Sequence, residues 1–352
     1  MPRISQQDLI AFGTRLLSAK GLKQSDAHYL AANATEVASM GVTTHGLPQL
    51  CVIVAAIDRG DIDPRGTPAI IREKAAIALI DAKGAPGQLA MRLAIATAMN
   101  KARQAGVGWA GVSRTTWIGA LGVFLVPVAK EGFFAQMFAQ DSHCQDSPPA
   151  GGIDAMFSTN PIALAFPTDG DPIVADFSTC AMSMGKTTQL ARQGRKAPAK
   201  IFFDRDGNPT DDPKVVSATS EGGSIQFMGG DHNEHKGYAL SFWIEALTAM
   251  IGGACNNPDL PLRQSFSVCV IDPNAFADSA HYLAEIERFK KRVKSSRVRP
   301  GFGEIRFPGE RSQRLARESA SQGVEVANDL FEQLNGLARA AGVDELGAAP
   351  CG

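Results

Sequence analysis

The sequence lacks an excess of charge of either sign. Its 35 Lys and Arg residues nearly balance its 36 Asp and Glu residues, which leaves a formal net charge of -1 at pH 7. A balanced chain has no overall field to attract nucleic acid or an anionic membrane surface. We therefore expect neither nucleic acid nor a membrane as a partner, and we expect a small-molecule ligand instead.

The sequence also lacks paired cysteines and long apolar runs. Its six cysteines are scattered without a CxxC pair, a pattern that favours neither a zinc ribbon nor a disulfide framework. The first residues, MPRISQQDLIAF, carry no apolar run of signal-peptide type. The most apolar stretch, Trp117 to Ala129, is too short to span a membrane and contains Pro127. These absences predict a cytoplasmic protein in a reducing setting.

The chain does have enough apolar material for a large core, since 44% of its 352 residues are hydrophobic. Periodic apolar residues predict helices over 5–20, 25–41 and 48–60, with Ser5 and Ser25 as N-caps of the first two and Gly60 ending the third. Alternating segments predict strands over 69–81, 109–112, 133–138, 162–166, 173–177 and 266–271. Further helices are expected over 88–104, 238–251, 280–294 and 323–337, and residues 194–237 are expected to be polar and Gly-rich.

His45 stands in a short joint between the second and third helices, within Thr43-Thr44-His45-Gly46. A joint held between two helices can present a side chain rigidly to a cleft. Histidine has an unperturbed pKa of about 6.5, so it can give or take a proton near neutral pH. The alternative is a loop histidine that merely bonds a nearby carbonyl.

Three motifs of known binding proteins are rejected on their context. Residues 106–111 match GxGxxG, but they follow a predicted helix and lead into a strand, the reverse of the dinucleotide-binding order. Gly185-Lys186-Thr187 resembles the end of a phosphate-binding loop, but Cys180 stands where that loop needs glycine. Residues 231–235 hold four potential metal ligands, but no helix is predicted to place them on one face and no distant ligand can be named. We therefore expect no metal site.

Three other segments have the composition of ligand-binding turns: Ser158 to Pro161, Val174 to Thr179 and Phe307 to Arg311. Each places small hydroxyl, amide or charged side chains at a strand end or in a turn, where binding residues concentrate. Taken singly, each is explained by a plain turn or cap. Asp176 is the sharpest signal, because a carboxylate at the end of an apolar strand needs a donor partner, and a histidine ring is one natural donor.

Six segments together carry a resemblance to a known family over about residues 5–343. They are GVTTHG (41–46), GDIDP (60–64), STNPIALAFP (158–167), IVADFSTC (173–180), HKGYALSF (235–242) and FPGER (307–311). In these segments the chain resembles the malate/L-lactate dehydrogenase family of non-Rossmann type. That family includes diketogulonate reductase, ureidoglycolate dehydrogenase, sulfolactate dehydrogenase and the cyclic ketimine (piperideine- and pyrroline-2-carboxylate) reductases.

The resemblance implies an α/β fold with a mixed, mainly antiparallel sheet and flanking helices. It implies an N-terminal helical layer, residues 1–66, that carries His45 and packs with residues 300–352, and a cofactor-binding domain, residues 67–299. It further implies an oxidoreductase that uses NAD, with NADP as the alternative cofactor. Such an enzyme would act on a small 2-hydroxy or 2-oxo carboxylate and form a homodimer.

Carried over by position, the resemblance makes His45 the proton donor and assigns Asp176 to orient it. The residues that it implies for the cofactor are Val174, Ala175, Asp176, Phe177, Ser178, Thr179, Cys180, His235, Lys236, Gly309, Glu310 and Arg311. Those expected at the substrate are Thr44, Gln49, Trp117, Thr159 and Asn160. The chemistry suits His45, because an imidazolium can protonate and stabilise the alkoxide that forms when a 2-oxo acid is reduced.

Two departures from the family pattern concern the substrate. Pro48 and Gln49 stand where relatives commonly have an Arg able to clamp a carboxylate, and Trp117 stands in a turn where many have a second His. These losses leave two alternatives open. One is a cyclic ketimine reductase, whose ring substrate would suit stacking on Trp117. The other is a catalytically impaired member that binds a ligand as a sensor.

Overall fold

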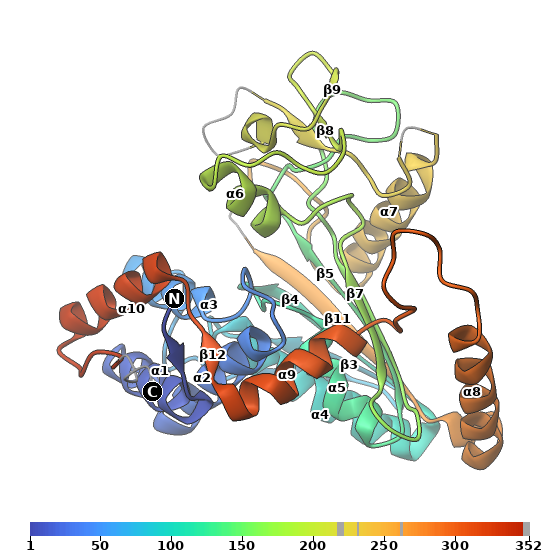
Figure 1. Ribbon diagram of the computed structural model, residues 1–352. Helices are drawn as coiled ribbons and strands as arrows, with labels where there is room; N and C mark the ends of the chain where they lie inside the picture. The colour runs from blue at the N-terminus through green and yellow to red at the C-terminus, as the bar shows by residue number, and fades with distance from the viewer. Residues whose placement is uncertain (217–221, 231, 261–262, 348–352) are drawn as a thin grey trace.

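The computed structural model describes residues 1–216, 222–230, 232–260 and 263–347. Its largest sheet has the strand order β2-β3-β4-β11-β5-β6-β7. The strands are β2 (Ala69–Glu73), β3 (Ile77–Asp81), β4 (Val107–Thr115), β5 (Phe134–Asp141), β6 (Ile162–Phe166), β7 (Ile173–Phe177) and β11 (Gln264–Ile271). All neighbours pair antiparallel except β3 and β4, which are parallel. The expected mixed, mainly antiparallel sheet is confirmed (Figure 1).

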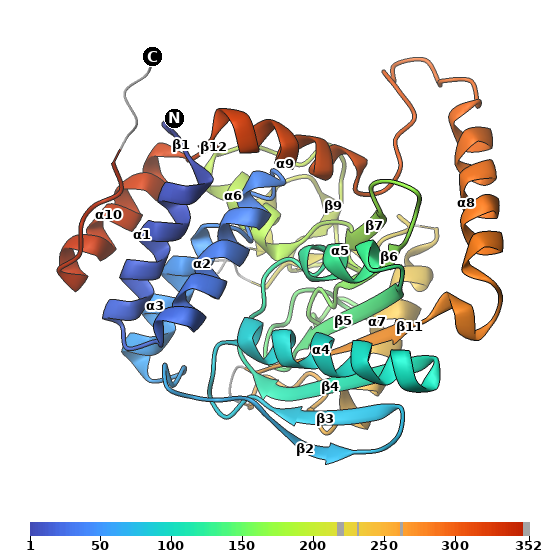
Figure 2. The same cartoon turned by 90° about the horizontal axis from the view of Figure 1, so that it is seen from below.

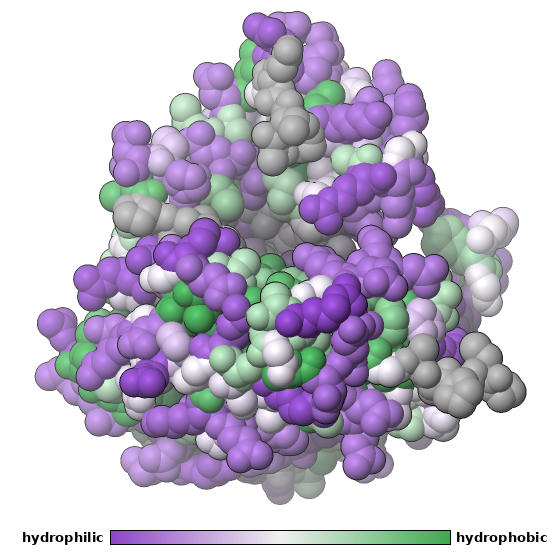
Figure 3. All heavy atoms as spheres, turned by 90° about the vertical axis from the view of Figure 1, so that its left-hand side faces the viewer, coloured by the Kyte–Doolittle hydropathy of each residue, from purple (hydrophilic) through white to green (hydrophobic). Residues whose placement is uncertain are grey.

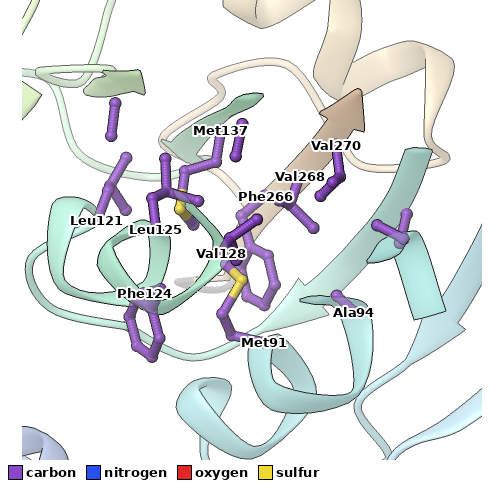
Figure 4. Close-up of a cluster of buried hydrophobic side chains, with 14 of the residues drawn as sticks. Met91, Ala94, Leu121, Phe124, Leu125, Val128, Met137, Phe266, Val268 and Val270 are labelled. Carbon is purple, nitrogen blue, oxygen red and sulfur yellow. The ribbon is translucent and has the colours of Figure 1, made fainter. Parts of the chain in front are cut away.

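Helices cover both faces of this sheet (Figure 2). They are α4 (Gly87–Ala105) and α5 (Gly122–Lys130) on one face and α7 (Glu234–Met250) on the other. Because strand side chains alternate between faces, Met137 and Phe266 pack with Met91 of α4 in one buried cluster (Figure 4). Phe138 of β5 packs with α7 instead. The central strands are therefore covered by helices, whereas the edge strand β2 is largely exposed.

The order of α4 and β4 explains why the GxGxxG match is not a dinucleotide fingerprint. Gly106 ends α4 in the left-handed conformation, and β4 follows at once. The rejection of that motif is confirmed, because a helix leads into a strand here.

A helical layer lies beside the sheet. It consists of α1 (Gln6–Ala19), α2 (Gln24–Ser39), α3 (Pro48–Arg59) and α10 (Asn328–Ala341), with the paired short strands β1 (Arg3–Ile4) and β12 (Val324–Glu325). Phe12 and Leu334 lie in one buried cluster, so the first and last helices share a core. Ser5 caps α1 as predicted, by accepting a hydrogen bond of 3.0 Å from the amide three residues on. The predicted cap Ser25 is wrong, because α2 begins after Lys23.

A small part stands above the sheet in the view of Figure 1. It contains α6 (Met184–Arg192), β8 (Phe202–Phe203), β9 (Pro209–Thr210), β10 (Ser224–Ile225) and the short helix η1 (Pro213–Val216). Phe157, Phe202 and Phe227 form its buried core. Three short strands form within the polar, Gly-rich passage 194–237, and α7 begins at Glu234, before the predicted helix start at residue 238.

Two helices in the last quarter of the chain take different positions (Figures 1 and 2). They are α8 (Ser279–Lys294), which follows the short helix η2 (Pro273–Ala275), and α9 (Glu310–Gln322). The first stands off from the body, whereas α9 runs from β7 to the helical layer. Val174 N–H donates to the Pro308 carbonyl at 3.1 Å, and Ser319 Oγ donates to the Ser39 carbonyl at 3.1 Å. The expected turn is present at Pro308 and Gly309, and α9, which begins at Glu310, was not predicted.

The molecular surface on the side of the N-terminal helices is mostly hydrophilic, with scattered apolar patches (Figure 3). No helix in the described parts of the chain is both long and apolar enough to cross a membrane.

Candidate active site

Two cavities meet at the joint between α2 and α3. The larger, of about 680 Å³, lies between β7, the start of α5, the start of α9 and this joint. The smaller, of about 220 Å³, lies against the ends of β5 and β11 and the start of α6. Residues that line both are His45, Gly119, Leu121, Thr159, Pro161 and Ser183. His45 is therefore placed at the boundary of the two volumes.

His45 is held by close neighbours. Gly46 packs so closely on α2 that an added Cβ would lie 2.8 Å from the Ala38 nitrogen. Gly185 packs so closely on the ring that an added Cβ would lie 3.2 Å from His45 Cε1. Thr44 Oγ1 lies 2.7 Å from His45 Nδ1, within hydrogen-bond distance. Among the described residues, none hydrogen-bonds to Nε2. The ring is thus fixed at one nitrogen and available at the other.

Burial lowers the pKa of His45 below its ordinary value of 6.5. The neutral ring is therefore the resting form near pH 7. When Nδ1 carries the proton of the neutral ring and donates to Thr44 Oγ1, Nε2 is free to accept a proton from a ligand. The imidazolium carries a second proton on Nε2 and can donate it to a ligand.

Asp176 lines the larger cavity but does not pair with His45. Its Oδ2 accepts a hydrogen bond of 2.7 Å from Gly122 N–H at the start of α5, and the Leu121 amide also donates to the carboxylate. This geometry corrects the predicted pairing, because helix-start amides satisfy the carboxylate instead of the ring. Burial raises the pKa of Asp176, and the two amides partly oppose the rise.

The predicted cofactor segment of β7 divides between the larger cavity and the protein interior. Its cavity-lining residues are Val174, Ala175, Asp176, Phe177 and Ser178. Thr179 and Cys180 are not in the described lining. Thr179 Oγ1 donates to the Thr159 carbonyl at 3.0 Å, and Cys180 is buried in the core of the small part. Burial raises the pKa of the Cys180 thiol to about 12, so it stays protonated.

The start of α9 forms another wall of the larger cavity. Gly309 lines it with a φ of 83°, and a Cβ there would lie 2.9 Å from the Val174 carbonyl oxygen. Only glycine fits this close approach. Ser312 and Gln313 also line the cavity. Sequence reasoning missed these two residues because it expected a turn that ended at Arg311.

Four predicted cofactor residues lie outside the described lining of both cavities. Glu310 binds Lys294 Nζ at 2.8 Å, and Arg311 is exposed on the first turn of α9. His235 and Lys236 are exposed in the first turn of α7, so they are helical rather than part of a loop. Their contact with a cofactor stays a prediction.

Most of the predicted substrate residues lie at the cavities. Gln49, Trp117 and Thr159 line the smaller cavity, and Thr44 lines the larger. Asn160 is fully buried behind the wall, where its Nδ2 donates to Glu245 Oε1 at 2.9 Å. Asn160 therefore supports the wall, and its contact with a substrate is not seen in this geometry.

Sequence reasoning missed a polar wall of the smaller cavity, formed by Gln140, Asp141, Asp146 and Gln264. Asp141 ends the apolar strand β5, so the signal that drew attention to Asp176 applies to it as well. The other three residues carry no comparable signal. None of the described residues that line this cavity is Lys or Arg.

Comparisons with known proteins place the chain among enzymes. Residues 4–335 match the family model of malate/L-lactate dehydrogenase. The chain is 30% identical over 346 residues to the Delta(1)-pyrroline-2-carboxylate/Delta(1)-piperideine-2-carboxylate reductase of Pseudomonas putida, with 95% of this chain and 96% of the relative covered. It is 26% identical over 345 residues to the ureidoglycolate dehydrogenase (NAD(+)) of Escherichia coli, with 94% and 95% covered. The structure of malate dehydrogenase from Pyrococcus horikoshii OT3 is similar, with a TM-score of 0.87, 26% identity, and 97% of this chain and 96% of that chain covered.

Proposed function

The chain belongs to the malate/L-lactate dehydrogenase family, and we propose that it transfers a hydride between a nicotinamide cofactor and carbon 2 of a small 2-hydroxy or 2-oxo carboxylate. One observation carries the proposal: His45 lines both cavities, and its Nε2 has no partner among the described residues. A cofactor in the larger cavity and a substrate in the smaller would meet beside this ring. The similarity to dehydrogenases of ureidoglycolate and malate supports the same chemistry.

In the reductive direction, the His45 imidazolium donates a proton from Nε2 to the oxygen that develops negative charge and becomes neutral, while Thr44 holds Nδ1. In the oxidative direction, the neutral ring accepts that proton. Proton transfer by a positioned side chain contributes about 10² to 10⁴-fold to the rate. The nicotinamide, when bound, supplies or accepts the hydride. Asp176 keeps the start of α5 in place as a wall of the cofactor cavity.

The larger cavity fits an extended cofactor. Its volume of about 680 Å³ lies within the range of about 300 to 1,000 Å³ typical of such sites. Gly122 and Gly309 line this cavity without side chains. The wall is tightly packed at Gly122, where an added Cβ would lie 3.0 Å from Asp176 Cβ. We assign NAD, with NADP as the alternative, to this cavity. Residues 67–299 would bind the cofactor, and residues 1–66 with 300–352 would bring His45 and the start of α9 against it.

Arg311→Ala is expected to weaken binding of the reduced cofactor about tenfold, because Arg311 is proposed to meet its distant end. A charge-assisted hydrogen bond is worth about 1.5 to 3 kcal/mol, and the exposure of Arg311 favours the lower end. Arg339→Ala is the control, since Arg339 is exposed on α10 and pairs with Glu345. Fluorescence titration with NADH and NADPH gives the affinities. If the affinities for both cofactors were unchanged, the distant end of the cofactor would not contact Arg311 on α9.

The rate of reduction is expected to fall as the pH rises through the pKa of His45. Burial holds this pKa below 6.5, and the imidazolium, the stronger acid, predominates only below it. kcat/KM for reduction should therefore have its midpoint below 6.5, and kcat/KM for oxidation should rise over the same range. Asp146, whose pKa burial and Asp141 raise to about 7, titrates in the same cavity. A midpoint that vanishes in Asp146→Asn would belong to that carboxyl and contradict the assignment.

A second candidate function is that of a cyclic ketimine reductase, which delivers hydride to a C=N carbon. Trp117 favours it, because it gives the smaller cavity an aromatic wall on which a flat ring can stack. A third candidate, of another class, is an impaired member that binds a ligand as a sensor. The position of His45 at both cavities argues against this third candidate.

One experiment separates the three candidates. The purified protein is mixed with NADH or NADPH and a panel of 2-oxo acids and cyclic imines, and cofactor oxidation is followed by absorbance. Turnover of 2-oxo acids supports the first function, turnover of imines alone supports the second, and binding without turnover supports the third. If neither cofactor binds, the proposed hydride transfer is wrong.

We also propose that the protein is a cytoplasmic homodimer. Phe242, Trp243 and Met250 are exposed on one face of α7, and Phe289 is exposed on α8. Soluble monomers rarely leave such apolar faces uncovered, and a second copy in a symmetric dimer is the commonest cover. Light scattering during gel filtration is expected to give twice the chain mass of 37.2 kDa. The mass of one chain would contradict the dimer.

A further inference from the structure

The smaller cavity holds buried hydrogen-bond acceptors that have no donors. Within the described residues, Gln49 Oε1, Gln140 Oε1, Asp141 Oδ2 and Gln264 Oε1 are buried and unpartnered. All four residues line this one cavity. The relative exposures of Gln140 and Asp141 are only 1% and 6%. An unpaired buried acceptor costs about 1 to 3 kcal/mol, so a cluster of them calls for a ligand that brings donors.

The positions of these oxygens are fixed by the bonds that their neighbouring atoms make. Gln140 Nε2 donates to Glu245 Oε2 at 3.0 Å, which leaves Gln140 Oε1 without a donor among the described residues. Asp141 Oδ1 accepts from the amides of His143 at 3.0 Å and Cys144 at 3.3 Å, which leaves Asp141 Oδ2. Side-chain hydrogen bonds from Cys144 and Trp117 lower the pKa of Asp141, whereas Oδ2 itself has no partner among the described residues.

Two carboxylates share this cavity without a cation. Asp146, with a relative exposure of 6%, lies close enough to Asp141 for its pKa to rise, first through burial and then through this like charge, to about 7. Burial also raises the pKa of Asp141. None of the described lining residues is Lys or Arg. Ionising both carboxyls is therefore unfavourable in the empty cavity, and a bound cation would favour their charged forms.

We propose that the smaller cavity selects a substrate that carries a positively charged nitrogen with N–H groups. Asp141 and Asp146 bind that nitrogen, and Gln140 and Gln264 accept hydrogen bonds from its remaining N–H groups. The inference rests on the proposed function, in which this cavity holds the substrate. A guanidinium or an ammonium has the required chemistry, because each combines charge with several donors. A second carboxylate at the same place would face two carboxylates and be repelled.

The cavity size sets the scale of the substrate. A volume of about 220 Å³ corresponds to about seven waters at about 30 Å³ each, enough for a small acid and one nitrogen group. His45 lies at the boundary with the cofactor cavity, so the reacting carbon would lie there and the nitrogen group deeper, at the ends of β5 and β11.

The test compares substrates that differ mainly in their far end. The probes are 2-oxo-5-guanidinopentanoate, 2-oxohexanoate and 2-oxohexanedioate, which end in a cation, a methyl group and an anion, and piperideine-2-carboxylate as the imine source. The parent enzyme is expected to show kcat/KM for the guanidinium acid at least about tenfold above that for the methyl acid, and the lowest value for the dianion. If the imine is used better than the guanidinium acid, the inference is overturned, because the imine nitrogen is bonded to the reacting carbon and cannot lie at the far end.

Two variants link this preference to the acidic pair. In Asp141→Asn and in Asp146→Asn, which keep the side-chain shape, the ratio of kcat/KM for the guanidinium acid to that for the methyl acid should fall at least about tenfold. Asp206→Asn, exposed in the small part, should keep the parent ratio. Gln264→Leu is the further variant if either carboxylate change prevents folding, and it should lower the same ratio. Thermal unfolding and NADH binding check that each variant is folded.

The outcomes separate this inference from the proposed function. A parent preference for the methyl acid or the dianion, or equal losses on all substrates in both variants, overturns the inference and leaves the function standing. If no probe is turned over with either cofactor, the function fails, and calorimetric titration of the guanidinium acid still tests recognition. Weaker binding by Asp141→Asn than by the parent then supports the inference. Equal binding, or no binding, overturns it.

Discussion

Replacing His45 by alanine is expected to lower kcat at least about 100-fold while NADH still binds with nearly the parent affinity. The reason is that a general acid acts in the transition state, whereas most of the cofactor cavity is formed by β7, α5 and α9. Single-turnover reduction and fluorescence titration measure the two quantities separately. A kcat close to that of the parent would show that His45 is not the proton donor.

Two variants make the result on His45 specific. His281→Ala removes an exposed imidazole from α8, outside the described lining of both cavities, and should leave kcat unchanged. Thr44→Val removes the hydroxyl that lies 2.7 Å from His45 Nδ1 and should cause a smaller loss, because the ring remains but is no longer held. If Thr44→Val lost as much activity as His45→Ala, Thr44 would have a larger role than that of a positioning residue.

The elements that the sequence predicted best are those with an internal apolar pattern. β6 and β7 begin and end at the predicted residues, and α3 ends at Gly60 as predicted, where the backbone is left-handed. Their signals are local. β-Branched residues alternate with other residues in the strands, and a glycine is favoured where a helix ends in a left-handed conformation. The sheet order is not local, and it entered through the resemblance to a family.

The elements that were missed have little apolar signal of their own. α9 contains one leucine and no other large apolar residue, and it is held by contacts made elsewhere, such as Gln313 Nε2 donating to the Pro172 carbonyl at 2.7 Å. In α6, Leu190 and Thr187 are the buried residues. Helices of this kind are stabilised by the surfaces that receive them, and those surfaces cannot be read from the helix sequence.

The site shows the same division. The sequence singled out His45 and Asp176, and the structure places both at the larger cavity. It could not supply their partners, because a carboxylate takes whichever donor the fold brings near, and here the Gly122 amide at the start of α5 is nearer than the ring. Asp146 was missed for the opposite reason: nothing in its neighbouring residues marks it, and only the meeting of β5 with the small part buries it.

The charge of the smaller cavity leads to the second large effect, on substrate preference. Gln49 lines this cavity and stands where relatives commonly have an Arg, and the described lining contains no cation. A small dianion such as oxaloacetate therefore lacks a charged partner and faces Asp141 and Asp146. The parent enzyme should use oxaloacetate poorly compared with a larger 2-oxo acid or a cyclic imine. Trp117 adds an aromatic wall to the cavity, and this wall favours a substrate that is flatter or bulkier than oxaloacetate.

Gln49→Arg is expected to raise kcat/KM for oxaloacetate about 10- to 100-fold, because a charge-assisted hydrogen bond contributes about 1.5 to 3 kcal/mol. The new guanidinium also meets competition from the two carboxylates, so the gain should be larger in Gln49→Arg combined with Asp141→Asn than in the single variant. Gln49→Met is the matched control, since it keeps the length of the side chain without charge or donors, and it should not help the dianion. Steady-state kinetics on oxaloacetate and 2-oxohexanoate measure the change. If the parent is fastest on oxaloacetate, or if the Arg variant gains no activity on it, another group binds the carboxylate. The next candidate is the start of α6, where Ser183 and Gly185 line the same cavity.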